Sequence, residues 1–270
     1  MKKLSKIYLS LVMLFLYVPI FVLIVFSFNE SKSRSVFTGF TFEWYQKLFE
    51  NELIISSLVN TIIIAIFASI ISTLLGTMAA IGINKMGKFS KSVIMNTTNI
   101  PIVNPEIVTG VSLMLLFVFF RVRMNFEFGF LTLLIAHITF DVPYVILNVM
   151  PKLRQLPPHL YEAAQDLGCS PIKAFFKVVM PEIMPGIISG FLMAFTFSLD
   201  DFIISYFTSG PTSQTLPITI YSMTRRKVSP EINALSTIIF IVVVIVLVVK
   251  NIVERKQVAA RRPAKEAEGI

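Results

Sequence analysis

Two adjacent carboxylates, Asp200 and Asp201, interrupt the otherwise apolar stretch FSLDDFIISYF at residues 197–207. Acidic side chains are costly inside a bilayer, and those found there usually serve binding or transport. A protease dyad needs two carboxylates that share a proton across a short gap. The side chains of adjacent residues on a helix point about 100° apart, so Asp200 and Asp201 cannot form such a dyad with each other. We therefore favour a binding or transport role for the pair, while Asp141 on another predicted helix keeps the protease alternative open. A solvated pair at the membrane surface, neutralised by a nearby arginine, is the third interpretation.

Other residues are further candidates for a role in binding or transport. Glu106 follows an Asn-Pro pair, a pattern typical of a helix start, where an acid also favours the helix dipole. Capping alone explains this acid, but transporters also place binding groups where a helix is broken in mid-membrane. Trp44 lies outside the predicted spans and suits either an interfacial belt or stacking on a substrate or a partner. Asp141 stands four residues after His137, so we expect these two side chains to pair.

The sequence lacks the common catalytic and metal-binding patterns. The two histidines, His137 and His159, are too few for a three-histidine zinc site, and neither belongs to an H-E-x-x-H pattern. The single cysteine, Cys169, excludes an intrachain disulfide and a thiolate metal cluster. Residues 82–88 match the first part of a phosphate-binding loop, but Phe89 replaces the required Ser or Thr, and a predicted transmembrane helix precedes the loop. We therefore expect no metal, cofactor or ATP site in this chain and no enzymatic activity.

Composition and long apolar runs indicate an all-α membrane protein. Of the 270 residues, 55% are hydrophobic and only 15% are charged, below the roughly 25% of charged residues in soluble domains. A helix needs about 20 mostly apolar residues to cross a bilayer. We predict one transmembrane domain, 1–270, whose six transmembrane helices lie at about 7–28, 55–83, 94–120, 128–150, 183–207 and 232–250.

The second predicted span carries a ridge of small residues. Ala68, Ser72, Gly76 and Ala80 recur every four residues and so lie on one face of a helix. Such a ridge favours close helix packing in a membrane. We expect it to contact either the core of this chain or a partner subunit.

The distribution of basic residues predicts that both termini are cytoplasmic. With the N-terminus inside, two thirds of the 24 Lys and Arg residues fall in cytoplasmic segments. Basic residues at 121–123 and 225–227 fall outside, which weakens this bias without reversing it. The basic C-terminal tail, 251–270, suits the anionic inner leaflet better than nucleic acid.

The longest predicted cytoplasmic loop, 151–182, has the pattern of two short amphipathic helices. Gly168 is expected to end the first helix, and a Ser-Pro pair is typical of the start of the second. Small residues such as Ala163 and Ala164 would let a partner protein approach closely. A helix pair lying on the lipid headgroups is the alternative.

Within this loop, Glu162, Ala163 and Ala164 are followed after three residues by Gly168 and, nine residues later, by VVMP ending at Pro181. The spacing resembles the EAA motif, E-A-A-x3-G-x9-I-x-L-P, of ABC importer permeases, with Val for Ile and Met for Leu. The resemblance implies the fold of a type I importer permease. It also implies that the motif forms a coupling helix that docks on a separate ATPase, which binds ATP and Mg²⁺. The coupling residues are then Glu162, Ala163, Ala164, Gly168 and Pro181.

Further segments extend the resemblance over nearly the whole chain: 42–45, 104–108, 136–140, 195–201 and 229–235. They are similar to segments of the spermidine/putrescine permeases of the PotC type. The resemblance implies substrate-pathway roles for five residues, namely Asp200, Asp201, Glu106, Trp44 and Ser198. Asp141 departs from the pattern, because we would expect a neutral residue there.

Membership of that family implies a polyamine importer of the bacterial cytoplasmic (inner) membrane that works by alternating access. The implied partners are a second permease subunit of the PotB type, an ATPase homodimer of the PotA type and an extracytoplasmic polyamine-binding protein of the PotD type. Polyamines are methylene chains that bear ammonium groups, which suits carboxylates and aromatic faces along a pathway. The alternatives are a permease for another small solute in the same family and, from a different class, a stand-alone channel or a proton-coupled carrier.

Overall fold

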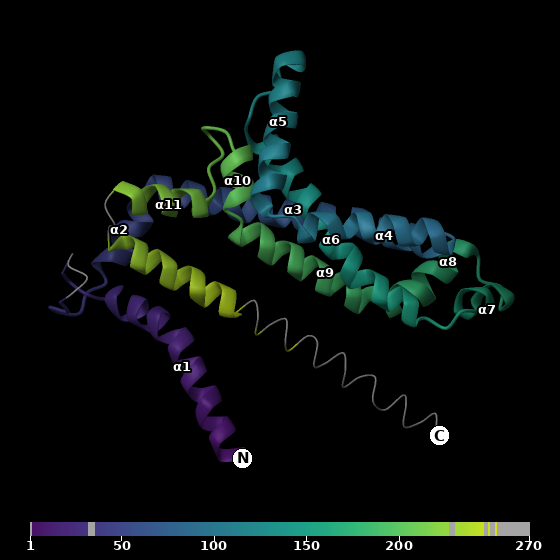
Figure 1. Cartoon of the computed structure of the whole chain (residues 1–270), viewed down its shortest axis with the longest axis horizontal. Coiled ribbons are helices and arrows are strands. Elements are labelled where there is room, and N and C mark those ends of the chain that lie inside the picture. The colour runs from purple at the N-terminus through teal and green to yellow at the C-terminus, as the bar shows by residue number, and fades with distance from the viewer. Residues whose placement is uncertain (1, 32–35, 227–229, 246–247, 249–251, 253–270) are drawn as a thin grey trace. The chain divides into compact units, whose positions relative to one another are not determined.

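The computed structural model describes residues 2–31, 36–226, 230–245, 248 and 252, and this part of the chain is all-α (Figure 1). Its only β-type pairing is an isolated antiparallel bridge between Asn29 and Phe40. The helices are α1 (Lys2–Phe26), α2 (Glu43–Glu50), α3 (Glu52–Lys85), α4 (Lys88–Val103), α5 (Glu106–Met124), α6 (Phe130–Gln155), α7 (Leu160–Asp166), α8 (Pro171–Ala174), the π-helix η1 (Phe175–Val179), α9 (Met180–Asp200), α10 (Ile203–Thr208) and α11 (Leu216–Arg226). Contacts divide the chain into two units, Met1–Ser57 with Thr219–Val248 and Leu58–Ile218 with Val249–Ile270.

Several helices are long and apolar enough to cross a membrane, as expected of a multi-pass membrane protein. The described residues contain five of them: Lys6–Phe26, Glu52–Lys85, Glu106–Met124, Phe130–Gln155 and Pro171–Asp200. The helix Glu231–Ile245 is also apolar but shorter, and most of residues 246–250 of the predicted sixth span lie outside the described residues. The count of six spans and the cytoplasmic termini therefore stay predictions. Apart from residue 252, the predicted tail 251–270 also lies outside the described residues.

The second unit is built on α6 and α9, which lie side by side and run antiparallel (Figure 1). Gly186 of α9 lies against Val149 of α6, and Gly190 lies against Val145. A Cβ atom added at Gly186 would lie 2.8 Å from the carbonyl oxygen of Asn148, so this contact requires glycine. The two helices therefore approach each other at nearly backbone distance, and this contact fixes their register.

The small-residue ridge of α3 packs against this chain's own α6. Ala68, Ser72 and Ala80 are fully buried. A Cβ atom added at Gly76 would lie 2.7 Å from the Val145 side chain of α6. The close packing expected from the sequence is confirmed, and the structure assigns the ridge to the core of the chain.

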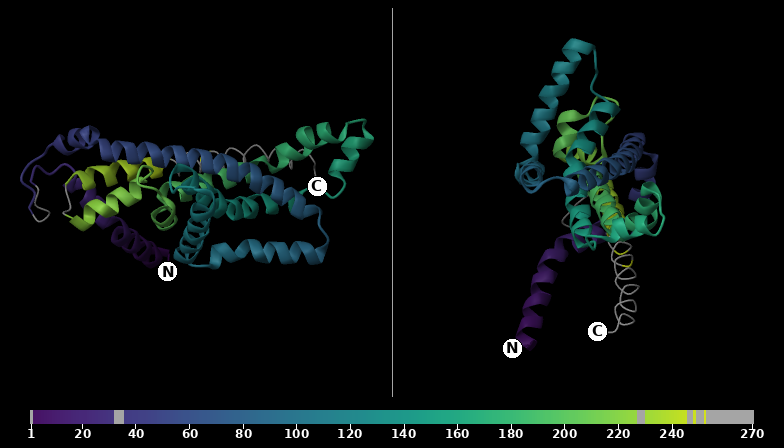
Figure 2. Two further views of the ribbon diagram at one scale, coloured as in Figure 1. Left: turned by 90° about the horizontal axis from the view of Figure 1, so that it is seen from above. Right: turned by 90° about the vertical axis from the view of Figure 1, so that its right-hand side faces the viewer.

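The third predicted span, 94–120, contains a break between α4 and α5. Asn104 and Pro105 are extended, with ψ angles of 138° and 130°. The break has a local cause, because proline lacks an N–H group and disfavours a helical conformation for the residue before it. Glu106 is the first residue of α5, but no side chain caps this helix start. Before the break, α4 turns back from the end of α3 (Figure 2).

The fifth predicted span, 183–207, is also divided. α9 ends at Asp200, Asp201 has an extended ψ of 123°, and α10 follows from Ile203. At its other end, α9 continues from α8 and η1, so the second predicted loop helix is the beginning of the apolar helix Pro171–Asp200. The π-helix between α8 and α9 is a local irregularity of a kind that often occurs at functional sites.

Candidate functional site

Asp201 caps the start of α10. Its carboxylate accepts hydrogen bonds from the backbone N–H groups of Ile204 (3.2 Å) and Ser205 (2.7 Å). The residue is only 9% exposed, and one carboxylate oxygen lies 3.6 Å from Nε2 of His137. An acid at a helix start satisfies N–H groups that have no partner within the helix. Asp201 therefore holds the break between α9 and α10 in place.

His137 connects three helices. Its Nδ1 atom lies 2.6 Å from the hydroxyl of Ser198 on α9, and its Nε2 atom lies 3.0 Å from the hydroxyl of Ser205 on α10. All three residues are buried. The sequence suggested Asp141 as the partner of His137, but the hydrogen bonds go to serines that are 61 and 68 residues away in the chain. Ser198, a predicted pathway residue, thus takes part in a buried polar network.

Asp200 has a different environment from its neighbour. It is the last residue of α9, and its side chain is exposed. Asp201 is buried and bonded to the backbone. The divergence expected for adjacent residues on a helix is confirmed, and Asp200 is the carboxylate that a solute can reach.

Aromatic rings and further acids lie close to this pair. Phe140, Tyr144 and Phe197 form a cluster in which the Tyr144 and Phe197 ring centroids are 4.5 Å apart. Tyr144 interacts electrostatically with Glu106 and Asp141. The exposed Glu106 begins α5, which packs closely on α10. We call Glu106, Asp141, Asp200 and Asp201 the acid cluster.

Trp44 belongs to the first unit and is held inside it. The ring is 3% exposed, and its N–H group donates a hydrogen bond to the Asn29 carbonyl oxygen (2.7 Å). The Lys47 ammonium lies 5.0 Å from the centroid of the indole. A hydrogen bond to Glu43 raises the pKa of Lys47, so this ammonium stays charged at neutral pH. The indole therefore already has a cation beside it, and stacking of Trp44 on a substrate stays a prediction.

The predicted coupling residues lie around α7 and differ in exposure. Glu162 is exposed and bonded to His159 (2.9 Å), and Ala163 is also exposed, whereas Ala164 is buried within the chain. Gly168 follows α7 with a φ of +83°, a left-handed conformation that favours glycine. Pro181 lies in the first turn of α9. Of the two alanines, only Ala163 is on the face that a partner can reach.

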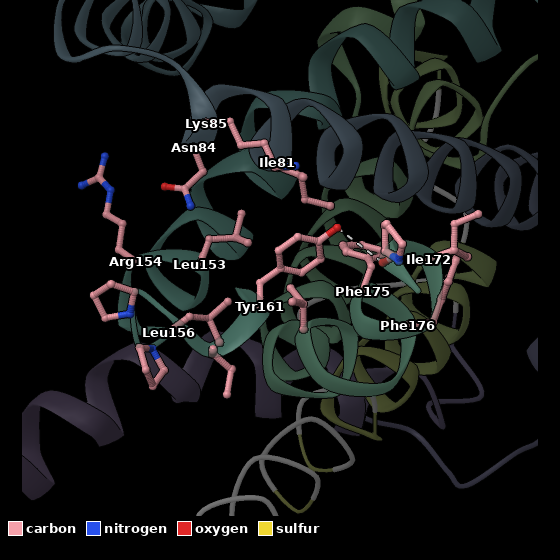
Figure 3. Close-up of a pocket in the computed structure, with 15 residues that line it drawn as sticks. Ile81, Asn84, Lys85, Leu153, Arg154, Leu156, Tyr161, Ile172, Phe175 and Phe176 are labelled. Atoms are coloured by element: carbon pink, nitrogen blue, oxygen red, sulfur yellow. Dashed lines mark hydrogen bonds between the residues drawn. The ribbon is translucent and has the colours of Figure 1, made fainter. Parts of the chain in front are cut away.

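A pocket of about 690 Å³ lies beside this segment (Figure 3). Its walls are mostly apolar and come from the ends of α3 and α6, from α7, and from α8 and η1. Tyr161 of α7 lies in the middle of the pocket and donates a hydrogen bond to the Pro171 carbonyl oxygen (3.4 Å). Lys85 lies over the same ring, 5.8 Å from its centroid. Tyr161 thus ties α7 to both α8 and α3.

Residues 72–256 match the family described as binding-protein-dependent transport system inner membrane component. The chain is 42% identical over 230 residues to the putrescine transport system permease protein PotI of Escherichia coli K12, covering 83% of this chain and 81% of that protein. It is 34% identical over 249 residues to the spermidine/putrescine transport system permease protein PotC of Haemophilus influenzae, covering 92% and 95%.

The fold is similar to that of a chain in the crystal structure of a bacterial alginate ABC transporter in complex with an alginate pentasaccharide-bound periplasmic protein. The TM-score is 0.71, with 94% of each chain covered and 16% sequence identity. This likeness confirms the fold of an ABC importer permease. At this level of identity it carries no information about the substrate.

Proposed function

This chain belongs to the family of binding-protein-dependent transport system inner membrane components, and from that premise we propose that it is a permease subunit of an ATP-driven polyamine importer. It is a multi-pass membrane protein and a transport subunit rather than an enzyme. Relatives named as permeases for putrescine or for spermidine and putrescine match more than four fifths of the chain. These names support a polyamine as the substrate.

The observation that carries the substrate assignment is an imbalance of charge in three stretches of the chain. Residues 92–120, 124–151 and 178–224 contain no Lys or Arg, yet they hold the acid cluster. Carboxylates in a membrane need a cationic partner, which a cationic solute supplies. The Tyr144 and Phe197 rings beside them can contact ammonium groups and pack on methylene groups. A polyamine has both kinds of group.

The residues of the pathway take different roles in this proposal. Asp200 receives an ammonium group, because it is exposed at the end of α9. Asp201 and Ser198 position the pathway, because they fix α10 and His137 through buried hydrogen bonds. Glu106 provides a second exposed carboxylate at the start of α5. Alternating access then moves the substrate between the two sides of the membrane.

The energy for transport comes from a partner in this proposal. α7 docks on a separate ATPase of the PotA type, which binds ATP and Mg²⁺, and Ala163 lies on the docking face. A second permease of the PotB type completes the pathway, and a binding protein of the PotD type delivers the substrate. The assembly lies in the bacterial inner membrane, with both termini of this chain and α7 on the cytoplasmic side.

Uptake into proteoliposomes tests the proposal. The chain is assembled with its second permease and ATPase, and labelled putrescine or spermidine is supplied with the binding protein. We expect uptake that requires both ATP and the binding protein. Uptake of another solute in place of polyamines would favour a different importer of the family, and uptake without ATP would favour a channel or a proton-coupled carrier.

A further inference from the structure

Asp141 is a buried carboxylate with no hydrogen-bond partner in the described part of the chain. It lies within α6 and is 0% exposed. Neither carboxylate oxygen has a hydrogen-bond partner among the residues that the structure describes. Buried polar groups are nearly always hydrogen-bonded, so an unpaired carboxylate within a membrane span requires an explanation.

The register of α6 and α9 shows why these oxygens are unpaired. His137, Asp141 and Val145 recur every four residues and share one face of α6. His137 contacts Ser198 of α9, and Val145 contacts Gly190 of α9.

Because the two helices are antiparallel, the residue opposite Asp141 is Ala194, midway between Ser198 and Gly190 in the sequence. Ala194 is itself fully buried. Its methyl group cannot donate a hydrogen bond, and it takes up little space. The carboxylate therefore faces a small apolar residue where its neighbour His137 faces a hydroxyl.

Nearby charges do not balance Asp141 either. Residues 124–151 and 178–224 contain no Lys or Arg. His137, one turn earlier on the same face, is engaged by Ser198 and Ser205. Asp201, which lies against His137, is also an acid and so adds a group of the same sign nearby. An incoming cation would relieve both the missing hydrogen bonds and this repulsion.

We propose that Asp141 is a second ammonium-binding position, one turn of α6 away from His137, so that Asp200 and Asp141 bind the two ends of a diamine. The proposal rests on the function proposed above and adds a residue and a substrate geometry to it. Asp141 lies four positions after His137 on α6, roughly 6 Å along the helix, and His137 contacts Asp201, the neighbour of Asp200. Five single bonds of about 1.5 Å separate the two nitrogens of a four-carbon diamine, which places them roughly 6 Å apart when the chain is extended.

The surrounding side chains suit the rest of such a molecule. Tyr144, which interacts electrostatically with Asp141, packs with Phe140 and Phe197. These rings offer apolar faces to methylene groups and cation-π contacts to ammonium groups. Asp141 is closed off in this structure, so the proposal requires α6 and α9 to separate around it during transport. The small residues at positions 190 and 194 keep that interface free of large interlocking side chains.

The test compares Asp141→Asn, Asp141→Glu and the control Thr139→Val in the assembled transporter. Thr139 is exposed on the same helix, and its hydroxyl donates a hydrogen bond to the Ile135 carbonyl oxygen one turn earlier in that helix. Uptake of putrescine and spermidine, ATPase activity stimulated by the loaded binding protein, and the amount of assembled permease are measured for each variant. We expect Asp141→Asn to lower uptake about tenfold, which corresponds to about 1.4 kcal/mol. Stimulated ATPase activity and permease amount should be unchanged, and Asp141→Glu and Thr139→Val should transport well.

Other outcomes overturn the proposal in distinguishable ways. Asparagine imitates a protonated acid, so normal uptake by Asp141→Asn would show that the native residue acts as a neutral group. If Asp141→Asn lowered permease amount, ATPase activity and uptake in parallel, and Asp141→Glu behaved in the same way, Asp141 would be a folding residue. If the unmodified transporter took up no polyamine, the proposed function would fail and this inference with it. Normal polyamine uptake by every variant would reject only the role of Asp141.

Discussion

Replacing Asp201 by Asn should destabilise the protein, whereas the same change at Asp200 should not. Asp201 uses both carboxylate oxygens to accept N–H groups, one from Ile204 and one from Ser205. An asparagine side chain has one acceptor oxygen, so one of these N–H groups would face the donor NH₂ group instead. The variant therefore loses one charge-assisted hydrogen bond and leaves a buried N–H group unpaired.

The size of the effect follows from these contacts. Hydrogen bonds to charged groups contribute about 1.5–3 kcal/mol, and helix caps contribute about 0.5–2 kcal/mol. We expect Asp201→Asn to lower the free energy of unfolding by about 2 kcal/mol. For a chain of this size, that corresponds to a thermal midpoint about 4–8 °C lower. Asp200 is exposed, so Asp200→Asn should change the free energy of unfolding by less than about 0.5 kcal/mol.

Thermal unfolding of the purified complex in detergent, together with polyamine uptake, separates the two carboxylates. Asp200→Asn should retain the normal midpoint and lose uptake, because it removes a charge that a solute can reach. Asp201→Asn should show the lower midpoint. Equal midpoints for the two variants would refute the capping role of Asp201, and normal uptake by Asp200→Asn would refute its role in receiving the substrate.

Further predictions concern the coupling helix and the core. Ala163→Arg should abolish ATPase co-purification and uptake at normal permease abundance, because the side chain is exposed, whereas Ala164→Arg should lower abundance through burial of an unpaired charge. Retained uptake in Ala163→Arg would contradict docking at this face. Gly186→Ala should cost about 1–3 kcal/mol, because its Cβ atom would lie 2.8 Å from the Asn148 carbonyl oxygen. In contrast, Gly82→Ala meets nothing within 4 Å in α3 and should be neutral or stabilise by up to about 1 kcal/mol. Equal thermal midpoints for these two glycine variants would contradict the close contact of α6 and α9.

Local signals predicted much of the fold. Membrane helices satisfy their own backbone hydrogen bonds, so long apolar runs were enough to predict an all-α membrane protein with several spanning helices. The Asn-Pro pair before Glu106 marked a helix start because proline restricts its own backbone and that of its neighbour, and α5 begins there. Gly168 marked the end of the first loop helix, because glycine readily adopts the left-handed backbone conformation in which helices often end. The structure gives Gly168 that conformation. The four-residue spacing of the α3 ridge predicted close packing but not its partner.

By itself, the sequence determined properties that depend on residues near one another in the chain: the membrane class, the helical pattern, the EAA-like motif and the presence of acids in long stretches without Lys or Arg. The tertiary structure decided what each acid contacts. It made Asp201 a cap and left Asp200 exposed. It gave His137 two distant serines as partners, whereas Asp141 has none among the residues that the structure describes. The physical reason is that a side chain's partner depends on which helix lies opposite and in which register. In α6 and α9 that register is fixed by glycine contacts between residues about 40 positions apart in the chain, which no local pattern encodes.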